Sequence, residues 1–217
     1  AGLEEARLAR ATFEHCRAWP RAGHEVYVAT NVPNHPAGRI YPGYRNALAQ
    51  TETVSGIKVY RLWTFLAANR GVLRRSLGYF SYLAMVILAA PFLPRVDVVV
   101  STSPQFFCGL AGYFVSRIKR VPWVLEIRDL WPESIMAVGA VSRSLTLRWL
   151  VWLANFAYRK ADLILCVTDS FKTAIMAEGI PGEKIAVIKN GVDLEFFSPE
   201  RSLGPEAGRI PGLENTQ

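Results

Sequence analysis

The sequence predicts a single α/β domain built on a doubly wound, mostly parallel sheet. Short runs rich in β-branched residues alternate along the chain with longer apolar segments of helical periodicity, which is the pattern of βαβ units. The run at residues 96–101 is apolar with little alternation, as in a strand buried on both faces. With 217 residues, of which 51% are hydrophobic and 20% charged, the chain suits one well-buried domain.

The first part of the chain is expected to begin with a helix at residues 3–21, whose apolar residues recur at roughly helical spacing. A strand at residues 25–30 follows. Residues 31–53 are rich in Pro, Gly and Asn and predict a long loop, of the kind that is usually functional or mobile. An alternating strand at residues 56–62 then precedes a long apolar helix at residues 73–90.

The rest of the chain repeats the order of strand and helix. The expected strands are residues 96–101, 122–127, 162–167 and 184–188. The expected helices are residues 103–120, 145–160 and 170–178. After Pro199 the sequence becomes loose, with scattered Gly and Pro. We therefore expect residues 1–199 to form the domain and residues 200–217 to be a linker or a cut end.

The chain is basic, with a formal net charge of +7, which favours an anionic partner. Nucleic acid, anionic lipid and a phosphorylated substrate all remain open on charge alone. The three cysteines, Cys16, Cys108 and Cys166, are far apart, which indicates reduced thiols and neither a disulfide framework nor a zinc site. The three histidines show no metal-ligand spacing, and the sequence contains no P-loop, GxGxxG or GxSxG motif.

The strongest candidate site is the segment that follows the strand at residues 122–127. It contains Arg128, Asp129, Trp131, Glu133 and a serine. Ligands of open α/β sheets bind at the carboxyl ends of strands, and these side chains can hold a sugar or phosphate and transfer a proton. Turn capping by Asp129 or core packing by Trp131 explains either residue alone, but the cluster at a strand end favours function.

Other segments place polar side chains at predicted turns. Ser103 and Gln105 begin a helix, where free N–H groups can receive an anionic or sugar group, although capping by Ser103 is an equally good explanation. Asn190 lies in an Asn-Gly turn, and a turn alone also explains it. His35 lies in the long loop, where it can contact a substrate.

A stretch in the middle of the chain carries six basic and no acidic residues. Within it, residues 72–82 pair Arg74 and Arg75 with Tyr79 and Phe80, as in a helix that lies on an anionic membrane surface. The apolar part that follows is too short to span a bilayer comfortably. A buried helix is the alternative, and it is favoured for the far end of this stretch.

Taken together, these segments resemble the N-terminal domain of family-4 glycosyltransferases of GT-B architecture, over about residues 6–199. The closest group is fucosamine-transferase-like enzymes, which build bacterial surface polysaccharides on a lipid carrier. The matching segments read Asn34-His-Pro36, Tyr41-Pro-Gly-Tyr44, Ser101-Thr-Ser-Pro-Gln-Phe-Phe107, Glu126-Ile-Arg-Asp-Leu-Trp-Pro-Glu-Ser134, Val167-Thr-Asp-Ser-Phe171 and Asn190-Gly-Val-Asp193. Each segment is weak alone, and their order and spacing carry the resemblance.

The resemblance implies one Rossmann-like half of a GT-B fold, which holds the acceptor, while a second domain holds most of the nucleotide-sugar donor. It implies retaining sugar transfer, without metal or other cofactor, to a polyprenyl-pyrophosphate-linked saccharide at the cytoplasmic face of the membrane. Asp129 is the first candidate catalytic residue, and Arg128 and Glu133 follow it. Candidate substrate contacts are Asn34, His35, Ser103, Gln105, Trp131 and Asn190.

The chain departs from the family pattern at both ends, where the first strand with its Gly-containing loop and the donor domain have no counterpart. A missing central strand predicts unpaired edges on its two neighbours. We therefore expect the fragment to have poor stability when expressed alone, and to be inactive alone because the donor domain has no counterpart. A non-catalytic membrane-surface or interaction module of α/β fold is the alternative. Nucleic acid is not expected as a partner, because no recognition motif is present and the basic residues lie beside apolar runs.

Overall fold

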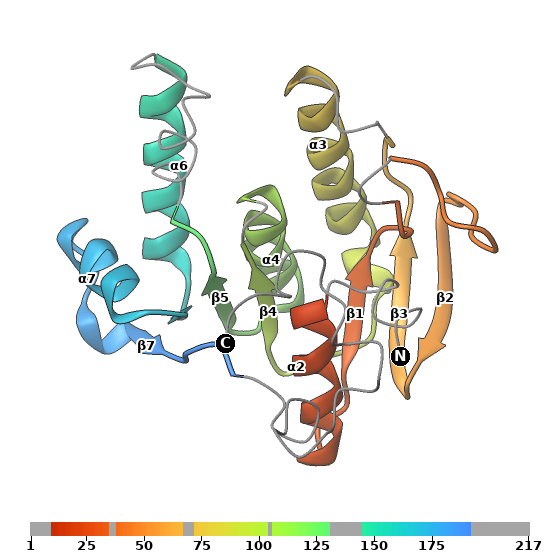
Figure 1. Ribbon diagram of the computed structural model, residues 1–217, viewed down its shortest axis with the longest axis horizontal. Coiled ribbons are helices and arrows are strands. Elements are labelled where there is room, and N and C mark those ends of the chain that lie inside the picture. Colours follow the sequence, from red (N-terminus) through yellow and green to blue (C-terminus); the bar gives the residue numbers. More distant parts are fainter. Residues whose placement is uncertain (1–9, 35–37, 67–71, 104–105, 131–144, 192–217) are drawn as a thin grey trace, which may run out of the picture.

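The computed structural model describes residues 10–34, 38–66, 72–103, 106–130 and 145–191 (Figure 1). The strands are β1 (Tyr27–Thr30), β2 (Ala49–Val54), β3 (Ile57–Leu62), β4 (Val99–Thr102), β5 (Trp123–Ile127), β6 (Leu163–Cys166) and β7 (Ile185–Val187). The helices are α2 (Arg10–Arg21), α3 (Val72–Ala89), α4 (Phe106–Lys119), α6 (Leu145–Lys160) and α7 (Asp169–Ala177), with short 3₁₀ turns at Ala90–Phe92 and Gly182–Lys184. The expected α/β class is confirmed. The expected linker at residues 200–217 lies outside the described residues.

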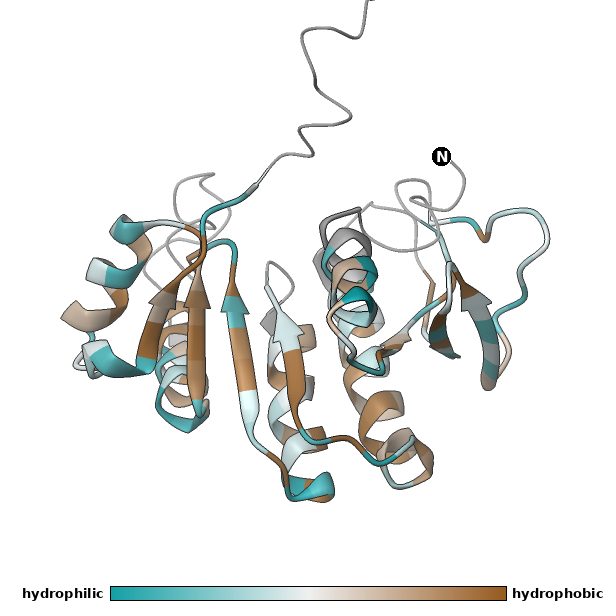
Figure 2. Ribbon diagram, turned by 90° about the horizontal axis from the view of Figure 1, so that it is seen from below, coloured by the Kyte–Doolittle hydropathy of each residue, from teal (hydrophilic) through white to brown (hydrophobic). Residues whose placement is uncertain are grey.

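The larger sheet has the order β4-β5-β6-β7, and all of its strands are parallel. Alternate residues of β5 are buried, beginning with Trp123, which is inaccessible to solvent. Ala154, Ala157 and Tyr158 of α6 belong to the same core cluster as this face of β5. The strands of this sheet and the helices packed on it are largely hydrophobic (Figure 2). The sheet therefore forms the rigid base that carries the polar residues at its carboxyl edge.

The smaller sheet has the order β1-β3-β2, with β1 parallel and β2 antiparallel to β3. Strand β2 corrects the sequence analysis, which placed all of residues 31–53 in a loop. The chain reverses at Ser55 and Gly56, which both adopt positive φ angles of 49° and 82°. Such a two-residue turn matches the twist of a β-hairpin. The hairpin turn therefore holds the Thr-rich segment of β2 against β3.

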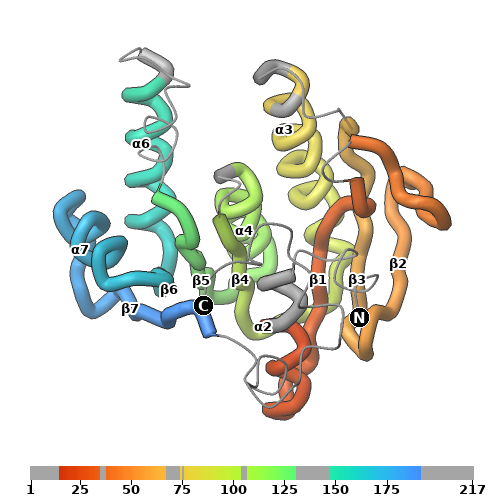
Figure 3. The backbone as a smooth tube through the Cα atoms, viewed as in Figure 1, coloured from red at the N-terminus to blue at the C-terminus, as the bar shows by residue number. Residues whose placement is uncertain are grey.

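Strands β1 and β4 are the edges at which the two sheets face each other (Figure 1), and each pairs on one side only among the described strands. Both are thus edge strands among the described residues. Helix α2 lies across this junction (Figure 3). Its Cys16 packs with Ile57 and Val59 of the smaller sheet, and its His15 Nδ1 lies 3.8 Å from Glu126 Oε1 of β5. The described parts of the two sheets are therefore joined by helix packing and not by hydrogen bonds between strands.

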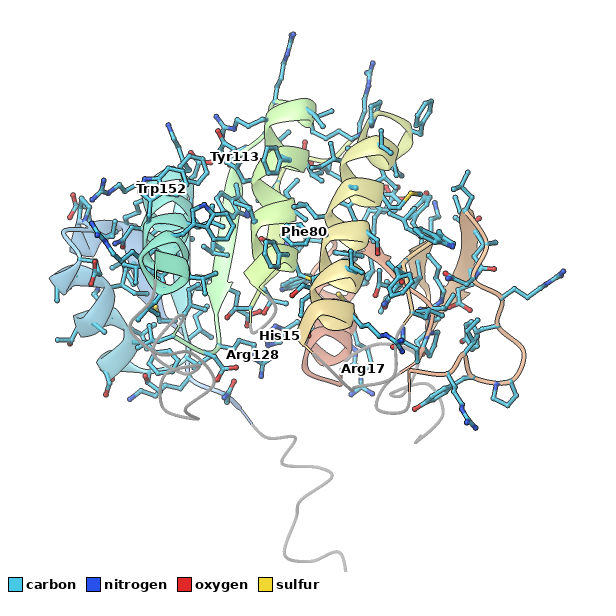
Figure 4. The ribbon with its side chains drawn as sticks, turned by 90° about the horizontal axis from the view of Figure 1, so that it is seen from above. His15, Arg17, Phe80, Tyr113, Arg128 and Trp152 are labelled. Atoms are coloured by element: carbon cyan, nitrogen blue, oxygen red, sulfur yellow. The ribbon has the colours of Figure 1, made fainter. Side chains whose placement is uncertain are left out.

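Helices α3, α4 and α6 form a layer on the opposite face from α2 (Figure 4). Val86 of α3 and Ala111 of α4 belong to one buried cluster that also reaches Leu62 of β3. The expectation of a buried far end of the α3 segment is only partly correct. Ala90 is fully buried there, but Leu88 is exposed and Phe92 is 88% exposed.

Helix α4 approaches the larger sheet closely at Gly112. A Cβ atom at this position would lie 2.5 Å from the Trp123 indole nitrogen and closer still to Ser101 Oγ. The same indole N–H donates a 2.7 Å hydrogen bond to Ser101 Oγ, which in turn donates to the Gly109 carbonyl at 2.9 Å. Only a residue without a side chain fits here, and this contact fixes α4 against the strands whose ends carry the candidate site.

Candidate functional site

Ser103 joins the ends of β4 and β5. Its backbone N–H donates to the Glu126 carbonyl at 2.9 Å, which extends the pairing of the two strands by one step. Its buried hydroxyl accepts hydrogen bonds from the backbone N–H groups of Arg128 at 2.9 Å and Asp129 at 3.3 Å. The described contacts of the hydroxyl therefore hold the segment after β5.

Arg128 and Asn190 come together although they are 62 positions apart in the sequence. The Arg128 Nη2 donates to Asn190 Oδ1 at 3.4 Å. Arg128 follows β5 and Asn190 follows β7, so the contact spans the carboxyl edge of the sheet past β6. This juxtaposition puts a guanidinium with several donors at the rim, where it suits a phosphate or a sugar hydroxyl.

Asp129 is exposed at the same edge, beside a small pocket. The pocket lies behind the loop and is lined mainly by apolar side chains, among them Leu110, Ile127 and Tyr158. Its volume of about 20 Å³ is enough for roughly one water molecule. A ligand larger than a water molecule would therefore bind outside it, on the open rim, where the Asp129 carboxylate is accessible.

The rim continues along the larger sheet to α7. Thr168 caps this helix by accepting a 3.2 Å hydrogen bond from the Phe171 N–H. The neighbouring Asp169 lies 3.3 Å from Lys189 Nζ, and both side chains are about three-quarters exposed. The carboxyl edge thus presents carboxylate, guanidinium, ammonium and amide groups from segments after three parallel strands.

Arg61 is one of the six basic residues in the middle of the chain, and the sequence assigned no role to it. Arg61 is 1% exposed. Its guanidinium pairs with Glu52, donates to the Asn31 carbonyl at 2.7 Å and lies over the Tyr44 ring at 5.0 Å. Charge alone carries no sign of burial, although the alternation of β3 places residue 61 on the buried side with residues 57 and 59. Arg61 fixes the loop after β1 and is not available to a membrane.

Asn34, in that same loop, donates from Nδ2 to the Val32 carbonyl at 2.8 Å, while its own carbonyl accepts from the Gly38 N–H at 2.7 Å. Its side chain thus stabilises the local turn. The structure brings Ser103, Arg128, Asp129 and Asn190 to one edge and gives Asn34 no described contact with them. His35, Gln105, Trp131 and Glu133 lie outside the described residues.

In the proposed membrane-surface segment, Arg74 and Phe80 are exposed and Tyr79 is half-buried. The Arg75 side chain is outside the described part. No helix within the described ranges is both long and apolar enough to cross a membrane. In the same ranges, no group of three or more His, Cys, Asp or Glu side chains could hold a metal ion.

Burial keeps the thiols of the three cysteines protonated. It raises the pKa of Cys16 and of Cys166 to about 11, and that of Cys108 to about 12, because the apolar surroundings disfavour the thiolate. Nucleophilic thiol chemistry therefore has no support among these residues.

The described polar groups lie at the carboxyl edge of a parallel sheet, which is where open α/β folds bind their ligands. The sequence profile of Glycosyltransferase Family 4 matches residues 8–196. This range covers most of the chain, and the chain belongs to that family.

Three crystal structures of HepE from Anabaena are similar to the chain. The complex with UDP has 23% identity and a TM-score of 0.39, and the match covers 56% of this chain and 30% of the HepE chain. The UDP-glucose complex has 23% identity and a TM-score of 0.39, and the match covers 66% of this chain and 33% of the HepE chain. The complex with UDP and glucose has 20% identity and a TM-score of 0.45, and the match covers 80% of this chain and 46% of the HepE chain. The chain spans less than half the length of these HepE chains. No curated protein sequence matches it.

Proposed function

We propose that the chain is the acceptor-side half of a retaining GT-B glycosyltransferase. In this proposal it takes part in moving a sugar from a nucleotide-sugar to a polyprenyl-pyrophosphate-linked saccharide, as in surface-polysaccharide synthesis. Family membership supports sugar transfer. The observation that carries the site is the convergence of Ser103, Arg128, Asp129 and Asn190 at one sheet edge.

The chemistry of transfer needs charges of both signs at this edge. The bond between the anomeric carbon and the leaving phosphate breaks as the bond to the acceptor oxygen forms, and the acceptor proton passes to the phosphate. Positive charge develops on the sugar ring and negative charge on the phosphate. Asp129 offers an accessible carboxylate for the ring side, and the Arg128 guanidinium offers donors for the phosphate side. The backbone N–H groups of these residues are held by Ser103, which keeps the loop in one place.

The lipid-linked acceptor implies work at a membrane surface, and we place the protein on the cytoplasmic face. Arg74 and Phe80 support this placement because both are exposed near the start of α3. A non-catalytic module of the same fold would use the same surface but would not need the polar rim after β5 and β7.

Sugar transfer by protein purified from the complete coding sequence tests the proposal. The assay follows label from a panel of UDP- and GDP-sugars, beginning with UDP-glucose, to a polyprenyl-pyrophosphate-linked saccharide. Asp129→Asn should lower kcat by at least about 100-fold, the lower range for a group that handles a proton or charge in the transition state. Asp169→Asn is the matched control, because it removes another exposed carboxylate from the same rim.

Equal activity of the two variants and the wild type would remove Asp129 from the mechanism. Equal losses in both would show a general effect of rim charge and would also contradict the assigned role. Absence of transfer with every donor and acceptor of the panel would favour the non-catalytic module.

A further inference from the structure

We propose that the first turns of α6 join those of α3 in a two-part docking surface for an anionic lipid membrane. The inference rests on the proposed function, because a lipid-linked acceptor is reached from a bilayer. It adds a second helix, α6, whose sequence had not indicated a membrane surface. The partner it assigns to this surface is a lipid bilayer and not a soluble protein.

The two helices are placed to touch a flat surface together. They stand on either side of α4 in one layer (Figure 4), and their first turns project farther from the sheets than α4 does (Figure 1). Each helix runs back toward the start of the next parallel strand, so its first turn lies at the carboxyl edge of the sheet. Both projecting ends are therefore on the same edge as Ser103 and Asp129.

The start of α6 exposes two tryptophans beside an arginine. Trp149 is 47% and Trp152 60% exposed, and Arg148 is exposed next to them. Trp152 stacks on Phe156 with ring centroids 6.0 Å apart, and Phe156 meets Tyr113 of α4 edge-on at 5.2 Å. The indoles thus rest on a fixed aromatic base. Exposed indoles beside cationic side chains are typical of segments that lie in the interface between headgroups and acyl chains.

The start of α3 repeats this combination. Arg74 is exposed, and Leu77 and Phe80 each leave almost half of their surface open to solvent. Phe80 packs on Phe107 of α4 with ring centroids 4.5 Å apart, so this end is also tied to the middle helix. The two helix starts therefore present matched sets of a basic residue and large apolar side chains.

The charges of the layer select an anionic partner. The described basic side chains at the two helix starts are Arg74 and Arg148, whereas the Arg and Lys residues of α4 and the other two of α6 lie in the last turns. None of the three helices contains Asp or Glu, although exposed Asp129 follows β5 on the same edge. A second copy of the chain would bring Arg74 and Arg148 close to the like charges of its own two helix starts, which is repulsive. Anionic headgroups satisfy the arginines while the acyl boundary receives the aromatic side chains.

Flotation with phosphatidylcholine vesicles, with and without phosphatidylglycerol, tests the surface on the 217-residue chain. We expect binding that requires phosphatidylglycerol and a blue shift of tryptophan emission. Joint replacement Trp149→Ser and Trp152→Ser should weaken binding at least about tenfold, because burying roughly half of one indole in lipid supplies that much. Arg148→Gln should weaken it about fivefold, the contribution of one basic residue near an anionic surface.

Two controls come from α2, on the opposite face. Trp19→Ser removes an indole that is 37% exposed, and Arg21→Gln removes a basic side chain from the last helical turn. Neither should change binding, and circular dichroism should show that all variants keep their helix content. Binding that survives the α6 variants, or that falls equally in the α2 controls, would overturn the proposed surface. Binding to phosphatidylcholine alone would overturn the electrostatic part, and tryptophan-dependent dimerisation without vesicle binding would assign the surface to a second copy.

Failure of docking is separable from failure of the proposed function. In the complete protein, transfer to a water-soluble, short-chain acceptor does not need a membrane. Transfer without vesicle binding would overturn docking and leave the function standing. Vesicle binding that depends on Trp149 and Trp152, in a protein that transfers no sugar, would support docking and overturn the function.

Discussion

Replacing Ser103 by alanine should loosen the segment that carries Asp129 while leaving the hydrophobic core in place. The hydroxyl, on a side chain of a residue only 5% exposed, accepts from the N–H groups of Arg128 at 2.9 Å and Asp129 at 3.3 Å. Alanine leaves both donors without this acceptor. Loss of the acceptor for the half-buried Arg128 N–H should lower the free energy of unfolding by about 1–2 kcal/mol. Loss of the longer bond from the exposed Asp129 N–H, which water can replace, should lower it by about 0.5 kcal/mol. We expect a total loss of about 2 kcal/mol.

Urea unfolding followed by tryptophan fluorescence measures this loss. Ser116→Ala is the matched control, because Ser116 is fully buried and its hydroxyl donates only a local 2.8 Å bond to the Tyr113 carbonyl within α4. That carbonyl can keep its helical partner, and alanine favours the helix, so the control should change stability by less than about 0.5 kcal/mol. Equal losses for the two variants, at an unchanged dependence on urea, would refute the role assigned to Ser103.

Three further predictions concern the core. Arg61→Ala should lower the free energy of unfolding by about 3–5 kcal/mol, because it breaks a buried ion pair on one side only; a loss below about 1 kcal/mol in urea would contradict the buried pairing. Gly112→Ala should be destabilising by about 1–3 kcal/mol through overpacking, whereas Gly109→Ala on the same helix should be nearly neutral, and similar midpoints for both would disprove the close approach. Because burial raises the pKa of Cys16 and Cys166 from 9.0 to about 11, these thiols ionise in the unfolded chain before they do so in the folded protein. Stability should therefore fall as the pH rises from about 9 to about 11, and rapid reaction of both native thiols with a disulfide reagent at pH 8 would argue against this.

The fold was predictable where periodicity and β-branching agree. The alternating strands and helices after β3 lie close to the expected positions, because each buried strand is a short apolar run between helical segments. Strand β2 was not predicted, because the Pro, Gly and Asn residues of 31–48 indicated a loop and the Thr-rich segment that follows was included in the same loop. The Ser55-Gly56 turn was the signal that could have identified it.

The site was predictable only through position at strand ends. That rule pointed to Ser103 and Arg128, whereas Asn190 was selected as part of an Asn-Gly turn, and the structure joins all three to one edge. The particular partners were beyond the sequence, because the contact between Arg128 and Asn190 depends on strand order and register. The structural role of Arg61 was not predictable, because its charge carries no sign of burial and only three-dimensional packing encloses its guanidinium.

The junction between β1 and β4 has a consequence for how the molecule opens. Since the two sheets share no ladder of backbone hydrogen bonds among the described residues, the smaller sheet can unfold locally without breaking a single strand pair of the larger one. We therefore predict two foldons in one domain, coupled through the buried cluster that joins Leu62 to α3 and α4. Backbone amide protons of β5 and β6 would then exchange with deuterium more slowly than those of β1 and β3. The polar rim after β5 and β7 would stay folded while the smaller sheet opens.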